Sequence, residues 1–469
     1  MTAAVEKAAA PSRGIYINSG TGGQLLPIDI GHAEYMAVVN PETAFWALSR
    51  KDALADNLTN GKLAALFKEK SAEFAEEMHM LRFGLKPSAV YVNPTERCNL
   101  DCSYCYIPAD MRRFGEHMST DKLIGAMTRL KDYFSQTMDA GRRPQIIFHG
   151  AEPLLNKEAL FEAIDHFGDA FGFGVQTNAT ALDDEAIDFF TSRGISIGLS
   201  LDGPAAEITL KTRRTWRGKG VHDKVLEAIG KLEGYPSFSV ISTATTENLM
   251  HLKSMVELFH GLKVPTCMLN QVRCTLPRAR TVRPQDQDLA RHFIAALERS
   301  HELYQETGRK LVVANFANIL LAIIAPTARR LMCDISPCGG GRAFFAMSPK
   351  GDLFPCSEFI GLPEFNGGNL FKDDIASVLD SAAFRKVTER DVDTFKPCGD
   401  CAIRHFCGSP CPAEVHEING AMEYTGAFCE FYEEQVRYAF RLIADGREDA
   451  YLWDGWDEGV ETALDVVLR

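Results

Sequence analysis

The sequence predicts an α/β protein built around a partial (β/α)6 barrel, with a small α+β domain before the barrel and a cysteine-rich domain after it. The first observation is that six short β-branched runs alternate with longer helical patterns, which is typical of a parallel sheet covered by helices. The second is that polar and glycine residues follow these runs, where ligands bind in such barrels. The third is that all but two of the 13 cysteines fall into spaced sets. The predicted strands span 88–93, 145–150, 173–178, 195–202, 237–245 and 264–272.

Amphipathic stretches separate the predicted strands. In residues 121–134, the apolar side chains Leu123, Met127 and Leu130 lie on one helical face, and two later stretches show the same pattern. Such a face packs against a sheet. Six strand–helix units, rather than eight, fit a partial barrel, which we place at residues 87–310.

Residues 1–86 precede the barrel and are predicted to form a separate unit. Their patterns indicate strands at 14–18, 24–30 and 35–40, followed by helices at 42–50, 61–70 and 72–84. This order resembles the small winged-helix-like peptide-recognition element of enzymes that modify ribosomally made peptides, in which a leader peptide adds a strand to the sheet edge. A packing domain that covers the barrel is equally compatible with the order.

Two segments follow the barrel: a cysteine-rich domain at 311–429 and a helical extension at 430–469. The longest apolar stretch, residues 320–325, is too short to cross a bilayer, so we expect a buried helix there. Residues 430–443 repeat apolar side chains at helical spacing, which predicts a helix docked on the rest of the protein.

The formal net charge of −13 argues against non-specific binding to nucleic acid, which needs a basic surface. The N-terminal residues lack the apolar core of a signal peptide. We therefore expect a cytoplasmic protein with reduced thiols and with no membrane partner.

Three cysteines lie directly after the first predicted strand, in the spacing Cys98-x3-Cys102-x2-Cys105, with the aromatic Tyr104 before the third. Three thiolates can hold three irons of a [4Fe–4S] cluster and leave the fourth iron open for substrate chemistry. The motif resembles the defining motif of the radical S-adenosylmethionine (SAM) enzymes. The resemblance implies that the open iron binds SAM and that an electron from the cluster splits SAM, releasing a 5′-deoxyadenosyl radical that abstracts a hydrogen atom. Taken alone, the motif is also compatible with zinc binding or coincidence.

Eight further cysteines resemble the SPASM extension of radical SAM enzymes that modify peptides, as does Gly351 in the segment before one of them. Eight thiolates are enough for two fully ligated [4Fe–4S] clusters, which makes three clusters with the open one. The resemblance implies an interleaved pairing. The first auxiliary cluster would take Cys333, Cys338, Cys356 and Cys411, and the second would take Cys398, Cys401, Cys407 and Cys429.

Two other interpretations of these cysteines are weaker. Disulfides are rare where thiols are kept reduced. Zinc fits the C-x2-C and C-x3-C spacings between residues 398 and 411, but would leave the remaining cysteines of the set unexplained. Outside the sets, Cys267 lies in a predicted strand and is expected to be a buried apolar residue, and Cys274 has no assigned role.

The segment HGAEPLL after the second predicted strand resembles the family's GGE motif, which binds the SAM amino group. Gly150, Ala151 and Glu152 occupy the three positions of that motif. Alanine replaces the second glycine, and its methyl group is tolerable if the backbone angles permit. By itself the segment could be a tight turn before a helix.

Polar residues at the ends of the third and fourth predicted strands are further candidates for binding SAM. Asn178 and Ser200 could contact the carboxylate or the ribose, although strand-end capping is an equal alternative. Arg213, Arg214 and Arg217 could pair with the carboxylate, although a solvated basic loop accounts better for at least two of them.

The resemblance as a whole implies an enzyme that abstracts a hydrogen atom from a peptide or protein and so installs a modification, such as a thioether or carbon–carbon cross-link. The alternative is an anaerobic sulfatase maturase that forms formylglycine. Sulfatase-maturing relatives carry an Asp directly after the third cysteine of the SPASM set, where this chain has Ser357 and then Glu358, a candidate general base. Expected partners are the substrate, with or without a leader segment, and an electron donor such as flavodoxin or ferredoxin. A non-catalytic electron-transfer or scaffold protein is another class, which the SAM-type triad and the segment HGAEPLL disfavour. A zinc-bound regulatory protein is a third class.

Overall fold

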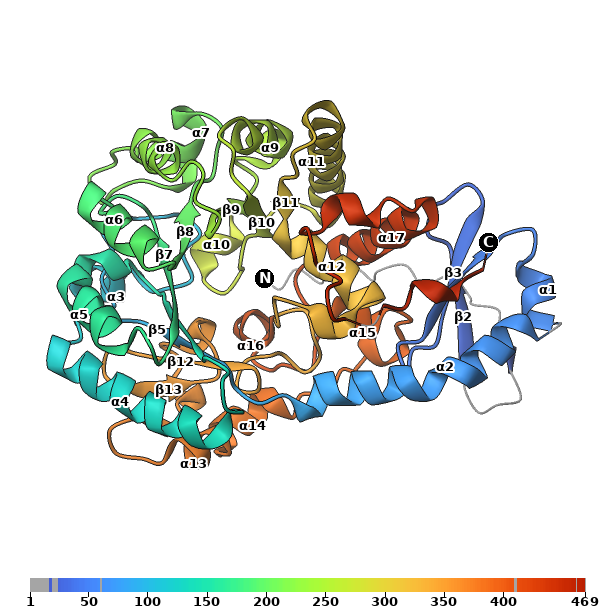
Figure 1. Cartoon of the computed structure of the whole chain (residues 1–469), viewed down its shortest axis with the longest axis horizontal. Coiled ribbons are helices and arrows are strands. Elements are labelled where there is room, and N and C mark those ends of the chain that lie inside the picture. The colour runs from blue at the N-terminus through green and yellow to red at the C-terminus, as the bar shows by residue number, and fades with distance from the viewer. Residues whose placement is uncertain (1–16, 19–23, 60, 409–410, 461, 469) are drawn as a thin grey trace, which may run out of the picture.

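A computed structural model describes residues 17–18, 24–59, 61–408, 411–460 and 462–468. Figure 1 shows the barrel strands and their helices at one end of the molecule and a second, smaller sheet at the other. The long helix α2 (Lys62–His79) runs between these two ends.

The six predicted barrel strands are confirmed, and all are parallel. The sheet continues past the predicted boundary at residue 310, because a seventh parallel strand pairs with the last of the six. These strands are β5 (Ala89–Val92), β6 (Gln145–Phe148), β7 (Gly172–Thr177), β8 (Ser196–Ser200), β9 (Phe238–Ala244), β10 (Thr266–Gln271) and β11 (Val312–Val313). At the other edge, β12 (Phe344–Met347) pairs parallel to β5 and continues antiparallel into β13 (Asp352–Phe354) and β14 (Gly368–Asn369). The cysteine-rich segment therefore extends the barrel sheet.

Helices follow the barrel strands as the amphipathic patterns predict. In α4 (Thr120–Thr137), Leu123, Met127 and Leu130 are fully buried, and Ser119 caps the start by accepting the N–H of Lys122. The barrel helices are α3 (Ala109–Phe114), α4 (Thr120–Thr137), α5 (Lys157–Phe167), α6 (Asp184–Ser192), α7 (Ala206–Thr212), α8 (His222–Lys231), α9 (Leu252–Gly261), α10 (Pro277–Arg280) and α11 (Asp286–Thr307).

The N-terminal sheet contains β1 (Ile17–Asn18), β2 (Gln24–Ile28), β3 (Tyr35–Val39) and β4 (Trp46–Arg50), followed by α1 (Leu54–Thr59) and α2. Of the first predicted strand, residues 14–16 lie outside the described residues. The two later predicted helices form one helix, α2, which ends in a π-turn at Met80–Gly84.

The predicted helix at 42–50 is wrong, because β4 occupies most of it. The side chain of Asn40 accepts hydrogen bonds from the backbone N–H groups of Glu42 and Thr43, at 3.2 and 2.8 Å. The N–H of Asn40 donates to the carbonyl of Phe45. This turn reverses the chain, so Trp46 pairs with Val39 in an antiparallel ladder. Asn side chains favour such turns over helix interiors.

The far end of the chain joins the same sheet. Strand β15 (Val467–Leu468) pairs parallel to β4, with Val467 opposite Leu48. Val466 is fully buried beside it. The N-terminal sheet is therefore built from both ends of the described chain.

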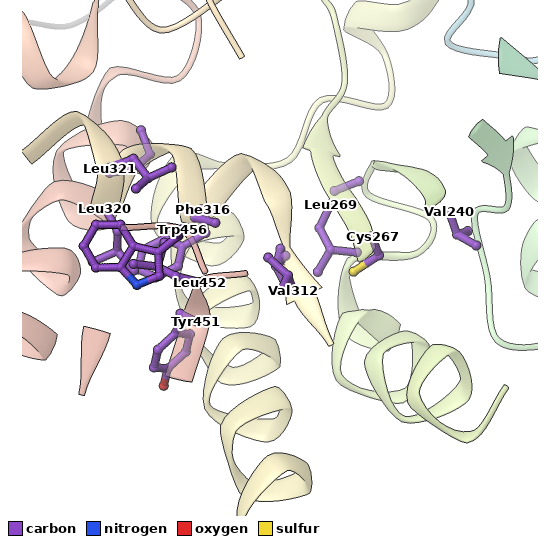
Figure 2. Close-up of a cluster of buried hydrophobic side chains, with 14 of the residues drawn as sticks. Val240, Cys267, Leu269, Val312, Phe316, Leu320, Leu321, Tyr451, Leu452 and Trp456 are labelled. Atoms are coloured by element: carbon purple, nitrogen blue, oxygen red, sulfur yellow. The ribbon is translucent and has the colours of Figure 1, made fainter. Parts of the chain in front are cut away.

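The predicted buried helix is confirmed as α12 (Ala314–Ile324), which is buried along nearly its whole length. In Figure 2 the α12 side chains Phe316 and Leu320 are drawn with Tyr451, Leu452 and Trp456, and all of them belong to the same buried cluster as the barrel residue Leu269. The predicted docked helix is confirmed as α17 (Cys429–Asp445). The remaining helices are α13 (Ile375–Leu379), α14 (Ala382–Thr388), α15 (Arg404–Cys407) and α16 (Pro412–Asn419). None of the helices in the described ranges has both the length and the apolarity needed to cross a membrane.

Candidate functional site

The loop that follows β5 carries Cys98, Cys102 and Cys105. Backbone hydrogen bonds anchor it to its surroundings: Cys98 donates to the carbonyl of Arg112, and Ser103 donates to that of Thr212. The three thiols are free and pack around buried Leu100 in a small apolar cluster. The loop is therefore held in place at the carboxyl end of the sheet.

The three thiols lie close enough to influence one another. Burial raises the pKa of Cys98, and the neighbouring Glu152 and Cys102 raise it further. Burial likewise raises the pKa of Cys102 to about 11, with Cys105 adding to the increase. Such thiols stay protonated at neutral pH unless a positive group, such as a metal centre, takes them as thiolates. Cys98 Sγ also accepts the N–H of Leu100 at 3.4 Å. The donor set therefore fits a metal cluster.

Tyr104, the aromatic residue of the loop, is tied to the end of β8. Its hydroxyl donates to a carboxylate oxygen of Asp202 at 2.5 Å and accepts from Nη2 of Arg213 at 2.5 Å. Arg213 Nε also donates to Asp202 at 3.2 Å. Asp202 is fully buried. Arg213 is thus buried in an internal ion pair, whereas Arg217 lies exposed on the surface.

The segment after β6 shows why its first glycine is needed. Gly150 has φ +79°, and a Cβ atom there would lie 2.2 Å from the side chain of Asn93. Ala151, in contrast, does not have a positive φ, so its backbone conformation allows a methyl group. Glu152 is fully buried and accepts hydrogen bonds from Leu154 N, Thr177 Oγ1 and Asn178 N. Its carboxylate therefore joins the end of β6 to the end of β7.

Asn178 links the end of β7 to the cysteine loop. Its Nδ2 donates to Asn99 Oδ1 at 2.9 Å, and its Oδ1 accepts the N–H of Thr180. Ser200 is the last residue of β8 and is half-buried. The structure gathers Glu152, Asn178 and Ser200 at the strand ends near the first cysteines, and their contacts with SAM stay a prediction.

Four cysteines of the cysteine-rich domain form a second group. Burial raises the pKa of Cys333, and Cys338 and Cys411 raise it further. Burial raises the pKa of Cys356, as do Glu358, Cys338 and Cys411. Backbone N–H groups point at these sulfurs, from Gly340 to Cys338 at 3.3 Å and from Glu358 to Cys356 at 3.4 Å.

The remaining cysteines form a third group near the start of α17. Burial raises the pKa of Cys429 to about 12, and Cys401 and Cys398 raise it further. Burial raises the pKa of Tyr432, and the charge of Cys407, at the end of α15, raises it further. Tyr432 lies one turn along α17 from Cys429. The interleaved pairing of these eight cysteines into two clusters stays a prediction.

The 13 cysteines all lie in the described ranges, and no disulfide joins any of them. Among the described residues, no three His, Cys, Asp or Glu side chains converge as ligands of a single metal ion. Cys267 is fully buried in β10, as predicted. Cys274 is also buried, and its backbone N–H donates to Glu414 Oε1 at 2.5 Å.

Sequence reasoning missed two side chains near the predicted base Glu358, namely Tyr106 and Arg273. Tyr106 retains accessible surface, yet burial raises its pKa, and Glu358 and Cys105 raise it further. Burial also raises the pKa of Glu358 to about 7. Arg273 lies 4.0 Å from Glu358, measured between Nε and Oε1. The only sequence signals were that Tyr106 follows the third cysteine and that Arg273 follows β10.

The chain matches two known family models. The model of the radical SAM superfamily matches residues 92–259, and the SPASM model, an iron–sulfur cluster-binding domain, matches residues 338–402. An uncharacterised protein of Archaeoglobus fulgidus is 39% identical over 406 residues, which are 87% of this chain and 92% of that protein.

Two more distant relatives have names that state an activity or a bound ligand. A cysteine-type anaerobic sulfatase-maturating enzyme of Clostridium perfringens is 21% identical over 385 residues, covering 76% of this chain and 98% of that enzyme. The solved structure of native anSMEcpe with bound AdoMet and Cp18Cys peptide has a similar fold, with a TM-score of 0.65 at 17% identity. It covers 77% of this chain and 99% of that chain. The two domain models imply [4Fe–4S] clusters and SAM as cofactors. The chain is a radical SAM enzyme with a C-terminal SPASM domain.

Proposed function

We propose that this enzyme abstracts a hydrogen atom from a peptide or protein substrate and so installs a covalent modification. The observation that carries the proposal is the anchored loop with exactly three candidate ligands, Cys98, Cys102 and Cys105, at the carboxyl end of the sheet. When bound there, a [4Fe–4S] cluster and SAM supply the one-electron chemistry that can remove hydrogen from an unactivated carbon. The peptide complex of the similarly folded anSMEcpe supports a peptide as the partner.

The chain's own residues would bind and orient these groups. Cys98, Cys102 and Cys105 would hold the first cluster. Gly150 and the buried Glu152 would shape the SAM site, the former by letting the backbone turn beside Asn93. The other two cysteine groups would hold two auxiliary clusters with four thiolates each.

Glu358 is the proposed proton acceptor. Its Oε2 is buried without a hydrogen-bond partner. Burial raises the pKa values of both Cys105 and Cys356, and the negative charge of Glu358 raises them further. Glu358 therefore lies on the path between the first and second cysteine groups. A carboxylate in that place could take the proton that a substrate loses when its radical is oxidised.

A cross-link in a ribosomally made peptide is the finer form of the proposal, in which the N-terminal domain binds a leader. A leader can add as a strand only to a free edge. Residues 467–468 cover the edge of β4, so the leader would pair at β1 or displace β15.

Maturation of a sulfatase is the second candidate, favoured by the relative from Clostridium perfringens. The departure at Ser357, where such enzymes carry an Asp, counts against it. If Glu358 replaces that Asp, the base lies one residue further along the chain.

Anaerobic reconstitution tests the proposal. The reduced enzyme, supplied with SAM and then with flavodoxin or ferredoxin as the electron donor, should release 5′-deoxyadenosine. The Cys98→Ala, Cys102→Ala, Cys105→Ala triple variant should release none and keep about two-thirds of its iron. Nucleoside release by the triple variant, or none by the wild type, would contradict the proposal.

A further inference from the structure

Arg273 is a partly exposed arginine, with 27% of its side chain accessible, and one of its donors is buried without a protein acceptor. Its Nη1 is shielded from solvent and has no hydrogen-bond partner, and its nearest carboxylate, Glu358, lies at 4.0 Å. A guanidinium carries five N–H donors and a permanent charge. Leaving such a group inside a protein without an acceptor is costly, and each such case calls for a missing partner.

Two chain segments place Arg273 against the second cysteine group. On one side, the ion-pair partner Glu358 donates its own N–H to Cys356 Sγ. On the other side, the next residue along, Cys274, donates its N–H to Glu414, in the first turn of the helix that begins after Cys411. Arg273 therefore lies between the loop of Cys356 and the helix start at Cys411.

The carboxylates on either side do not neutralise Arg273 by direct hydrogen bonds. Glu358 Oε2 and Glu414 Oε2 are buried without partners of their own. Of the groups that act on the pKa of Arg273 by charge, Cys411 comes first, ahead of both glutamates. Because the segments that carry Cys356 and Cys411 both contact its neighbours, the missing partner lies on the side of the cysteines.

A buried arginine beside the same cysteines, Arg342, provides a contrast. Arg342 Nε donates to the carbonyl of Cys338, and its other nitrogens donate to the carbonyls of Leu81, Arg82 and Pro337. Its donors are used by the backbone, so it holds the loop together. Arg273 has no such acceptors, and this difference separates a counter-charge from a structural arginine.

We propose that Arg273 is the counter-charge of the auxiliary cluster held by Cys333, Cys338, Cys356 and Cys411, and that it raises the reduction potential of that cluster. A cluster with four thiolates is negative, and a nearby positive charge or N–H donor favours its reduced form. Arg273 acts as a positioning and tuning residue. The inference rests on the ligand assignment of the proposed function.

The test is a redox titration of the anaerobic holoenzyme followed by electron paramagnetic resonance, with iron content measured first. Arg273→Gln should shift the potential of one auxiliary cluster downward, because it removes the charge. Arg273→Lys, which keeps the charge but loses the fork of donors, should shift the same potential less. The potentials of the other two clusters in the same samples serve as internal controls.

The outcomes distinguish failure of the ligand assignment from failure of the role proposed for Arg273. Wild-type protein with only one cluster's iron would overturn the ligand assignment itself. Three clusters with potentials unchanged in Arg273→Gln would overturn the inference and leave the proposed function standing. Loss of one cluster in Arg273→Gln but not in Arg273→Lys would support it, since the charge would then be needed for that cluster to persist.

Discussion

The hydroxyl of Tyr104 donates to the carboxylate of Asp202 across 2.5 Å, and the pair connects the cysteine loop to the end of β8. Arg213 contacts both groups. Asp202 Oδ1 also accepts the N–H of Thr243, at the edge of the next strand. The loop that carries the first cysteines is therefore positioned by the buried Asp202–Arg213 ion pair at the end of β8.

Replacing Asp202 by Asn should destabilise the fold by about 3–5 kcal/mol, because it leaves the buried Arg213 charge without a partner. Urea denaturation of the two proteins measures the difference. Asp165→Asn is the matched control, since its pair with Arg193 is exposed. That change should cost less than about 1 kcal/mol. Equal losses in both variants would contradict the role of the buried pair.

Gly150→Ala should prevent the SAM site from forming, because the added Cβ would meet Asn93 at 2.2 Å in a backbone conformation that L-residues rarely adopt. Gly141→Ala separates the two effects. Gly141 has φ +90°, but nothing lies within 4 Å of a Cβ placed there. It should lose only about 1 kcal/mol of stability and keep SAM binding. SAM affinity, measured on reconstituted protein, should fall in the first variant alone.

His149→Gln should make the protein less sensitive to acid. Burial lowers the pKa of His149 from 6.5 to about 4, so the folded protein holds the ring neutral while the unfolded chain accepts a proton. Stability is therefore full above pH 6.5 and falls as the pH drops towards 4, by up to about 3 kcal/mol for this group. Melting temperatures between pH 7.5 and 5 should decline less steeply in the variant.

The control for that experiment is His79→Gln, on the exposed end of α2. Its melting temperatures should follow those of the wild type throughout. A slope in His149→Gln that matches the wild type would show that the ring is charged in the folded protein.

Double cysteine variants test the pairing of the auxiliary ligands. Removing Cys333 and Cys411 together should cost about one-third of the iron, because both would serve one cluster. Removing Cys407 and Cys411 together should cost about two-thirds, because each would serve a different cluster. Iron analysis with Mössbauer spectroscopy distinguishes these outcomes, and the reverse order of losses would rule out the interleaved pairing.

The barrel was predictable because its strands are short β-branched runs that end in polar residues, as at Ser200 and Asp202 after Leu199 in β8. The strand β4 was not, since Trp46, Ala47 and Leu48 fit a helix equally well until the turn at Asn40 is known. The pattern of β4 is set by contacts with β3 rather than by its own spacing.

Some residues of the candidate site were likewise predictable from the sequence and others were not. Spaced cysteines can be recognised along the chain, whereas Arg273 is a single arginine with no pattern around it, and only its missing acceptor marks it. Arg213 shows the opposite difficulty, because its loop sequence suggests solvent while its guanidinium pairs with Asp202 inside the protein.

The pairing of Val467 with Leu48 has a practical consequence for genetics. Deleting residues 1–86 would also uncover Val466 and remove Trp46, whose indole N–H donates to the carbonyl of Ile323 in α12. A truncated enzyme that loses activity would therefore say nothing about leader binding. Point substitutions on the outer edge of the N-terminal sheet, which leave both chain ends joined, are the changes that can answer that question.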